Sequence, residues 1–411
     1  MKWFKENNVF DLMLFLCCAV SGLILLFSYR TVEEPLPVSG RIVLLGIDGL
    51  SWTPLLPLLK AGKMPHLAAV MQQGSYGDMK TSPPDRSPQV WTTIATGVKV
   101  EKHNIATRYL LDKGKKRITL SSDWLFPPLW SYLSLKKIPT LVVGWPVSYP
   151  SSPLFGINIS DLFFPPWGNF KKSDLEEIKN RSFPSSFSDT ITGIKPLLEL
   201  SGAPVENAGV HPDLREIFHK SRHSDLMNAS LARYSFRKYN PGVTLIYLGG
   251  FYPLMKSACH ETGSAPVDVG PEIKRFNTTL KEEYRSSVEA YLMFLDRLIG
   301  LFQQVQHPED TFMIVSGRGL VPGSIDDVIN DPDVSLPLGI FTFQGPVIKS
   351  FNRPILGGAL EITPTILYLL DIPLDLAMDG GVMMLAIKET LSFHRKVRFK
   401  SYAPVFQPPT Q

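Results

Sequence analysis

Apolar residues in this chain form short unbroken runs that alternate with longer stretches of helical periodicity. The unbroken runs are typical of strands buried on both faces, and they lie at 42–47, 140–144, 243–248, 311–316 and 339–343. Helical spacing predicts helices between them at 55–60, 65–73, 88–96, 129–135 and 281–305. We therefore expect an α/β fold with a mostly parallel central sheet flanked by helices.

Residues 150–239 break this rhythm, because they are rich in Pro, Ser, Asn and charge and carry only short helical signals. We interpret them as an inserted cap region. The core of the fold is then expected to consist of residues 41–149 and 240–390, with a C-terminal tail at 391–411.

Residues 12–27 are apolar or small apart from Ser21, and with Val9, Phe10 and Tyr29 at its margins the segment 9–29 approaches the length of roughly 20 apolar residues that a helix needs to cross a bilayer. No small-residue cleavage site follows it, so an uncleaved anchor is favoured over a signal peptide. Lys2 and Lys5 predict a cytoplasmic N-terminus. Residues 30–40 would form a linker to an ectodomain in the periplasm, or on an extracellular or lumenal side.

Net charge and cysteine content limit the binding partners and the disulfides that we expect. A net charge of +4 over 411 residues argues against nucleic acid. Of the cysteines, Cys17 and Cys18 lie in the predicted anchor and leave Cys259 as the only thiol of the ectodomain, so no intrachain disulfide is expected there. The membrane itself, through 9–29, is the predicted partner, and a membrane protein or a lipid headgroup is a further candidate.

Two residues at element ends carry candidate chemistry. Asp48 ends the first predicted strand, and ligands of parallel sheets bind beyond such strand ends. Its carboxylate could hold a metal, or Asp48-Gly49 could be only a turn. Ser87 precedes Pro88 and is expected as the N-cap of a helix, a geometry that also suits phosphate.

The chain resembles the type I phosphodiesterase/nucleotide pyrophosphatase branch of the alkaline phosphatase superfamily. The resemblance runs from about Arg41 to Met384 and is weakest in the cap region. It rests on ordered motifs that read Leu-Gly-Ile-Asp-Gly at 45–49, Ser-Pro-Gln-Val-Trp-Thr-Thr-Ile-Ala-Thr-Gly at 87–97, Gly-Trp-Pro-Val-Ser-Tyr-Pro at 144–150 and Glu-Ile-Thr-Pro-Thr-Ile-Leu at 361–367.

This resemblance implies a site with two metal ions, usually zinc, and a Ser or Thr alkoxide that attacks phosphorus. Asp48 matches a metal ligand and Ser87 matches the nucleophile. The other ligand positions do not match the family, and they fall on Tyr252, Lys256, Gly317, Arg318 and near Ser335. We therefore interpret them as degenerate and expect no cofactor, or zinc or another divalent pair if the site is non-standard. His260 could replace a ligand only in a shifted alignment.

A guanidinium cannot ligate a metal, so we expect Arg318 to form an ion pair with Asp48. The remaining histidines, among them His66, His103 and His307, lack metal-ligand spacing and are expected in loops or on the surface.

Three functions remain open. The first is a membrane-anchored domain that has lost catalysis and acts in binding or scaffolding. The second is an active phosphoester hydrolase with Ser87 as nucleophile and a non-standard metal site. The third is a metal-free sensor that holds phosphate or another anion with Ser87, Lys256 and Arg318.

Overall fold

The structure, a computed structural model, describes residues 40–81, 86–112, 114–163, 180–187, 209–261, 282–319, 338–403 and 405. The chain divides into two units, one of them Val38–Lys388 with Lys396–Gln411. The other unit is Met1–Pro37 with Glu389–Arg395, of which the structure describes only 389–395, where helix α13 spans Glu389–His394. All features below belong to the first unit.

A nine-stranded sheet forms the centre of this unit, in the order β11-β2-β10-β9-β1-β8-β5-β6-β7. Its strands are β1 (Ile42–Ile47), β2 (Ser75–Lys80), β5 (Thr140–Trp145), β6 (Gly156–Ser160), β7 (Ser182–Phe183), β8 (Val243–Leu248), β9 (Thr311–Ser316), β10 (Gly339–Gln344) and β11 (Ile355–Gly358). Strands β9, β1, β8, β5 and β6 are parallel neighbours, whereas β10 pairs antiparallel with both β9 and β2. The predicted α/β fold with a mostly parallel sheet is confirmed.

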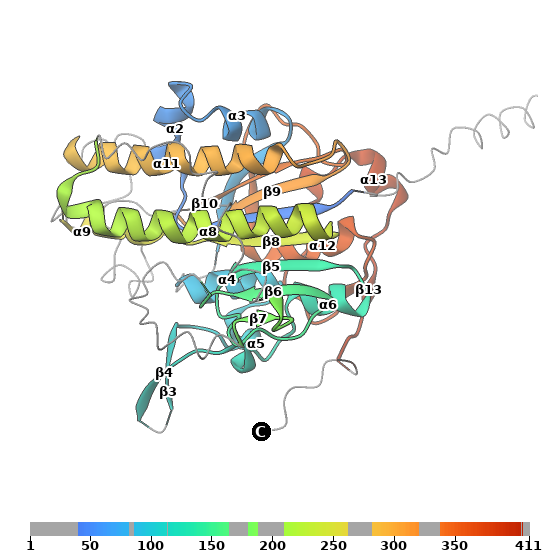
Figure 1. The fold of residues 1–411 in the computed structure, drawn as a ribbon. Coiled ribbons are helices and arrows are strands. Elements are labelled where there is room, and N and C mark those ends of the chain that lie inside the picture. Colours follow the sequence, from blue (N-terminus) through green and yellow to red (C-terminus); the bar gives the residue numbers. More distant parts are fainter. Residues whose placement is uncertain are drawn as a thin grey trace, which may run out of the picture. The chain divides into compact units, whose positions relative to one another are not determined.

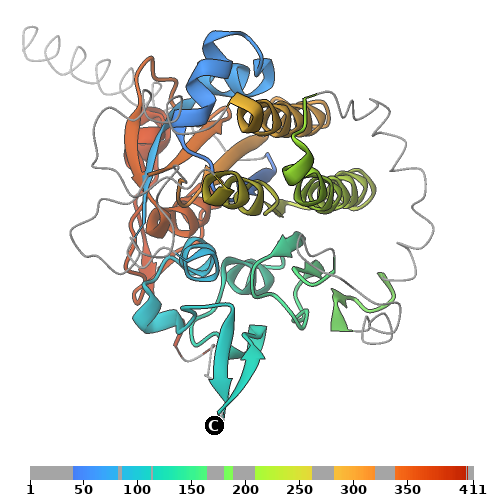
Figure 2. The ribbon, with the colours of Figure 1, turned by 90° about the vertical axis from the view of Figure 1, so that its left-hand side faces the viewer.

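Helices cover both faces of the sheet (Figures 1 and 2). One face is covered by α2 (Trp52–Lys60), α3 (Pro65–Gln72), α8 (Arg215–Tyr239), α9 (Phe251–Glu261) and α11 (Glu282–Gln303). The other face is covered by α4 (Ser87–Thr96), α6 (Leu129–Leu135) and α12 (Ile362–Leu369), and α5 (Val100–His103) follows α4. Small sheets pair β3 (Tyr109–Asp112) with β4 (Lys115–Ile118) and β12 (Leu374–Asp375) with β13 (Phe399–Lys400).

Successive residues of strand β1 face the two helical layers in turn. Val43, Leu45 and Ile47 belong to the hydrophobic core under the α8–α11 layer. On the opposite face, a Cβ at Gly46 would lie 2.4 Å from the ring of Trp91 in α4, so only glycine lets this helix approach so closely. The strand is thereby fixed from both sides, and its carboxyl end is held rigidly.

Several segments inside the predicted cap region join the core, including β7, which pairs with β6. β6 pairs with β5 in the central sheet, and α8 contributes residues such as Leu226 and Phe236 to the core. Residues 164–179 and 188–208 of that region lie outside the described residues, so the domain boundaries stay a prediction.

The predicted anchor at 9–29 also lies outside the described residues. Among the helices that the structure describes, none has an apolar stretch long enough to cross a membrane.

Candidate functional site

The candidate site lies at the carboxyl ends of three neighbouring strands, β9, β1 and β8. Asp48 directly follows β1, Arg318 lies two residues beyond β9, and Tyr247 is the penultimate residue of β8. Because the three strands are parallel, residues far apart in the sequence meet at one edge of the sheet. Asp48 and Arg318 are both buried there, with 1% and 4% of their surfaces exposed.

The backbone around Asp48 prolongs the sheet and then turns. The Asp48 N–H donates to the carbonyl of Leu248 at 3.0 Å, which extends the pairing of β1 with β8. Gly49 follows with a φ of 88°, a left-handed conformation that glycine adopts at little cost, and it bridges to Gly319. The turn therefore aims the Asp48 side chain across the strand ends.

Three side chains from three different elements donate to the Asp48 carboxylate. Ser87 Oγ and Tyr247 Oη both donate to Oδ2, the latter at 3.1 Å. Arg318 Nε lies 3.4 Å from Oδ1, which forms the ion pair that the sequence predicts. A buried carboxylate is costly without partners, and here a cation and two hydroxyls surround it.

Ser87 was expected to be the N-cap of α4, but that position is occupied by Arg86. Arg86 has the extended N-cap conformation and its side chain makes no capping hydrogen bond, and Ser87 is the first helical residue. The hydroxyl is therefore available for Asp48 and also accepts a hydrogen bond from Arg318 Nη2 at 3.1 Å. Asp48, Ser87 and Arg318 form a closed triangle of contacts, with the first turn of α4 beside it.

Arg318 is fixed at both its backbone and its side chain. Ser316 Oγ accepts the N–H of Leu50 and donates to the Arg318 carbonyl at 2.7 Å. The Tyr252 ring lies 3.9 Å from the guanidinium carbon, in cation–π geometry. Of the predicted positions on α9, Tyr252 thus reaches the site by contacting Arg318.

Gly317 lies directly beneath helix α4. A Cβ at this position would lie 2.1 Å from Cγ1 of Val90 and 3.0 Å from Cδ1 of Ile94. Real Cβ atoms essentially never approach another atom so closely, so any larger residue at 317 would have to displace the Val90 side chain or the helix that carries it. The close approach of α4 thus depends on the missing side chain.

Tyr247 is a site residue that the sequence analysis missed. Burial, and then the negative charge of Asp48, raise the pKa of Tyr247 well above its usual range, so its hydroxyl stays a donor. The ring of Trp91 packs edge-on against it at 4.9 Å between centroids. The only signal in the sequence was a tyrosine near the end of a mostly aliphatic strand, and such a residue also fits an ordinary core.

Asp225 on α8 is a second buried carboxyl group near the end of β8, and no sequence pattern pointed to it. It accepts hydrogen bonds from the Gly250 N–H at 3.0 Å and from Tyr291 Oη at 2.7 Å. Burial raises its pKa to about 7, against the lowering effect of these hydrogen bonds, and the charge of Asp48 adds to the rise. Asp225 thus titrates near neutral pH. Its carboxyl group contacts Gly250, the residue that directly precedes α9.

Other predicted positions are outside this constellation or cannot be placed in it. Lys256 is half-buried on α9, one turn beyond Tyr252, and its contribution to the site stays a prediction. Ser335 lies outside the described residues, as do all contacts of the His260 side chain. His103 is not in a loop or on the surface but fully buried, where it accepts from the Ile105 N–H, and burial lowers its pKa to about 4.

A metal site was the main chemical alternative. Within the described ranges, which omit 262–281 and 320–337, no group of three or more His, Cys, Asp or Glu side chains lies close enough together to hold a metal ion. At the candidate site itself the potential ligands are one carboxylate and hydroxyl oxygens, and a guanidinium contacts both Asp48 and Ser87.

The fold and this strand-end site define an alkaline-phosphatase-like α/β domain. Residues 42–337 match the family model described as type I phosphodiesterase / nucleotide pyrophosphatase, and the chain belongs to that family within the alkaline phosphatase superfamily. Members of the family are phosphoric ester hydrolases.

Several solved structures are similar to the chain. A protein assigned as a sulfatase from Bacteroides thetaiotaomicron is 12% identical with a TM-score of 0.55, over 84% of this chain and 73% of that one. A 2-O GAG sulfatase is also 12% identical, with a TM-score of 0.53 over 88% and 76%. Murine ectonucleotide pyrophosphatase / phosphodiesterase 5 is 13% identical, with a TM-score of 0.47 over 84% and 98%. The two sulfatase likenesses show a shared fold. No curated protein matches the sequence.

Proposed function

We propose that this domain has lost metal-dependent hydrolysis and acts by binding, as a phosphodiesterase-like scaffold at the membrane. The observation that carries the proposal is the Arg318 side chain, which contacts both Asp48 and Ser87. The same two residues match a metal ligand and the nucleophile of the family. The positive charge of Arg318 thus lies beside the carboxylate and the hydroxyl that a metal ion would contact in this family.

The ligand chemistry of the site supports this function. Two-metal catalysis needs ions that activate the nucleophile and neutralise the transferring group. The guanidinium of Arg318 has no lone pair to offer a metal, and its charge repels one that approaches Asp48. Among the residues at these strand ends that the structure describes, the donor set therefore does not fit a pair of divalent ions.

The packing beneath the site supports the same function. The resemblance assigns a ligand aspartate to position 317, where this chain has glycine. Because a Cβ there would meet Cγ1 of Val90 at 2.1 Å, an aspartate at 317 would require the Val90 side chain or α4 to move. Position 317 thus lacks the ligand that the resemblance assigns to it, and the Val90 side chain occupies the space beside it.

Metal content and turnover test this proposal together. We would purify the full chain and a Ser87→Ala variant, determine zinc and other divalent metals by elemental analysis, and assay hydrolysis of a bis-nitrophenyl phosphodiester. We expect substoichiometric metal and no difference in turnover between the two proteins. Stoichiometric metal with turnover that depends on Ser87 would overturn the proposal in favour of an active phosphoester hydrolase.

A second candidate, an anion sensor, is favoured by the donors that meet at Ser87. Arg318 Nη2 lies 3.1 Å from Ser87 Oγ, beside the first turn of the ten-residue helix α4. Such a helix end and a guanidinium both favour tetrahedral anions. Thermal stabilisation by phosphate or sulfate that disappears in Arg318→Lys, but persists in Lys238→Ala as a control, would support sensing at this site.

A further inference from the structure

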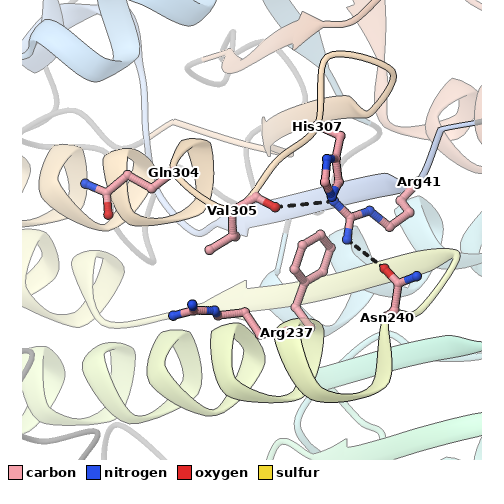
Figure 3. Close-up of a pocket in the computed structure, with 7 residues that line it drawn as sticks. Arg41, Arg237, Asn240, Gln304, Val305 and His307 are labelled. Carbon is pink, nitrogen blue, oxygen red and sulfur yellow. Dashed lines mark hydrogen bonds between the residues drawn. The ribbon is translucent and has the colours of Figure 1, made fainter.

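A cavity opens at the opposite ends of the same strands, away from the candidate site. It has a volume of about 410 Å³ and lies where β1 begins and where α8 and α11 end. Figure 3 shows Arg237 and Gln304, from these helix ends, on one side and Arg41, His307 and Asn240 on the other. We call this cavity the amino-end groove, and its size suits a small organic ligand.

Arg41 is held in a fixed orientation at the groove. Its guanidinium donates to the Asp310 carboxylate at 2.5 Å and to Asn240 Oδ1 at 2.8 Å. The carbonyl of Val305 accepts a longer hydrogen bond at 3.3 Å, and the Phe236 ring lies 4.2 Å from the guanidinium carbon. A preorganised guanidinium loses little freedom when it binds a ligand.

The groove offers more donors than acceptors. Asp310 is the neighbouring carboxylate, but Arg41 already neutralises it, and its hydrogen bonds outweigh burial and lower the pKa of Asp310 below the usual range. The exposed side chain of Arg237 then adds a positive charge. Burial, and then this charge, lower the pKa of Arg233 one turn earlier on α8, which indicates that positive charge accumulates here.

We propose that the amino-end groove binds a phosphate ester. Arg237, Arg41 and the amides of Asn240 and Gln304 would hold the tetrahedral anion, because guanidinium and amide donors suit phosphate oxygens. Phe236 and Val305 provide an apolar wall for the esterified group. This site is separate from Asp48 and Ser87 and does not depend on whether they are active.

The ester could be soluble or the headgroup of a lipid. The chain enters the fold at this end, since Arg41 directly precedes β1. The predicted linker of 11 residues, 30–40, can span at most about 40 Å. If the predicted anchor is in the membrane, the groove therefore lies within reach of lipid headgroups.

Hydrogen exchange on the full chain tests the proposal. The probes are sn-glycerol 3-phosphate, added to the protein in a neutral detergent, and phosphatidic acid, added to phosphatidylcholine nanodiscs that carry the protein. We expect slower exchange at 236–240 and 303–307 with at least one probe. Arg237→Ala should weaken that response about tenfold or more, since it removes a charged donor.

Lys238→Ala is the matched control. It removes the same charge from the same last turn of α8, but Lys238 does not line the groove and donates instead to Tyr234 Oη at 3.0 Å. We expect it to respond like the unmodified protein. Protection by glycerol phosphate in detergent would indicate a soluble ester, and protection only in nanodiscs with phosphatidic acid would indicate a headgroup. No protection by either probe, or equal losses in both variants, would overturn the proposal.

Discussion

The two ends of strands β1 and β9 are fastened by the same pair of residue types in reversed order. At the amino ends Arg41 precedes β1 and pairs with Asp310 before β9, whereas at the carboxyl ends Asp48 follows β1 and pairs with Arg318 after β9. About 20 Å of strand separates the two pairs. Each end thus carries a carboxylate neutralised by an arginine from the neighbouring strand.

The surroundings of the two pairs differ. Asp48 and Arg318 are enclosed by Ser87, Tyr247 and Tyr252. Arg41, by contrast, borders an open cavity, and Asp310 also receives backbone N–H groups. The comparison teaches that an arginine–aspartate pair at a strand end can be enclosed by side chains or can line an open cavity, depending on what covers it.

The two ends should differ most in the unfolding free energy that is lost when their arginine is removed. We expect Arg318→Ala to lower the free energy of unfolding by about 3–5 kcal/mol, because it leaves Asp48 buried without a cation. Arg41→Ala should cost less, about 1–3 kcal/mol, because the backbone N–H groups of Arg41 and His307 still donate to Asp310. Urea unfolding measures both.

Asp48→Asn in the Arg318→Ala background is the control, since it removes the uncompensated charge and should recover part of the loss. Equal costs at the two ends would contradict the distinction between a closed and an open pair.

Asp225 provides a third case for this comparison. Among the described residues its hydrogen-bond donors are Tyr291 and backbone N–H groups, whereas Asp48 and Asp310 each have an arginine donor. The pKa of Asp225 rises from 3.8 to about 7 on folding, so between these pH values the folded state binds the extra proton. Stability contributed by this group is therefore complete below about pH 4 and falls as pH rises towards 7, by up to about 4 kcal/mol.

The Asp225→Asn variant should lack this pH dependence, because asparagine keeps the neutral hydrogen-bonding shape. The difference in unfolding free energy between the two proteins should shift in favour of the variant between pH 4 and 7. A difference that stays constant over this range would mean that Asp225 does not titrate there.

The last prediction concerns the packing under the carboxyl-end pair. Gly317→Ala should destabilise by about 1–3 kcal/mol, because the new methyl group meets Val90. Val90→Ala removes the clashing atom, so the double variant should be more stable than the sum of the two single changes predicts. Strictly additive costs in a double-mutant cycle would show that α4 simply moves away.

Much of the fold could be predicted because β1, β8 and β9 are continuous apolar runs whose predicted bounds match the structure. β2 was missed, since Ser-Tyr-Gly-Asp-Met-Lys buries only alternate small or flexible residues and has weak strand propensity. The antiparallel direction of β10 depends on its partners, β9 and β2, and no local pattern encodes it.

The candidate site divides in the same way. Asp48 and Arg318 were predictable as strand-end residues, and their pairing followed from charge. Tyr247 and Asp225 were not, because a tyrosine in a buried strand and an aspartate within a helix acquire their roles only from neighbours that are remote in sequence. The correspondence of Tyr252, Lys256, Gly317 and Ser335 to ligand positions stays a prediction.

The contact between Gly317 and Val90 also has an evolutionary meaning. A single substitution at 317 adds a side chain where the helix already lies, so it is disfavoured before any ligand it might provide can be selected. A shorter side chain at 90 would make room for it, so the cost of a change at 317 depends on the residue at 90. The order in which substitutions at these two positions can accumulate is therefore constrained.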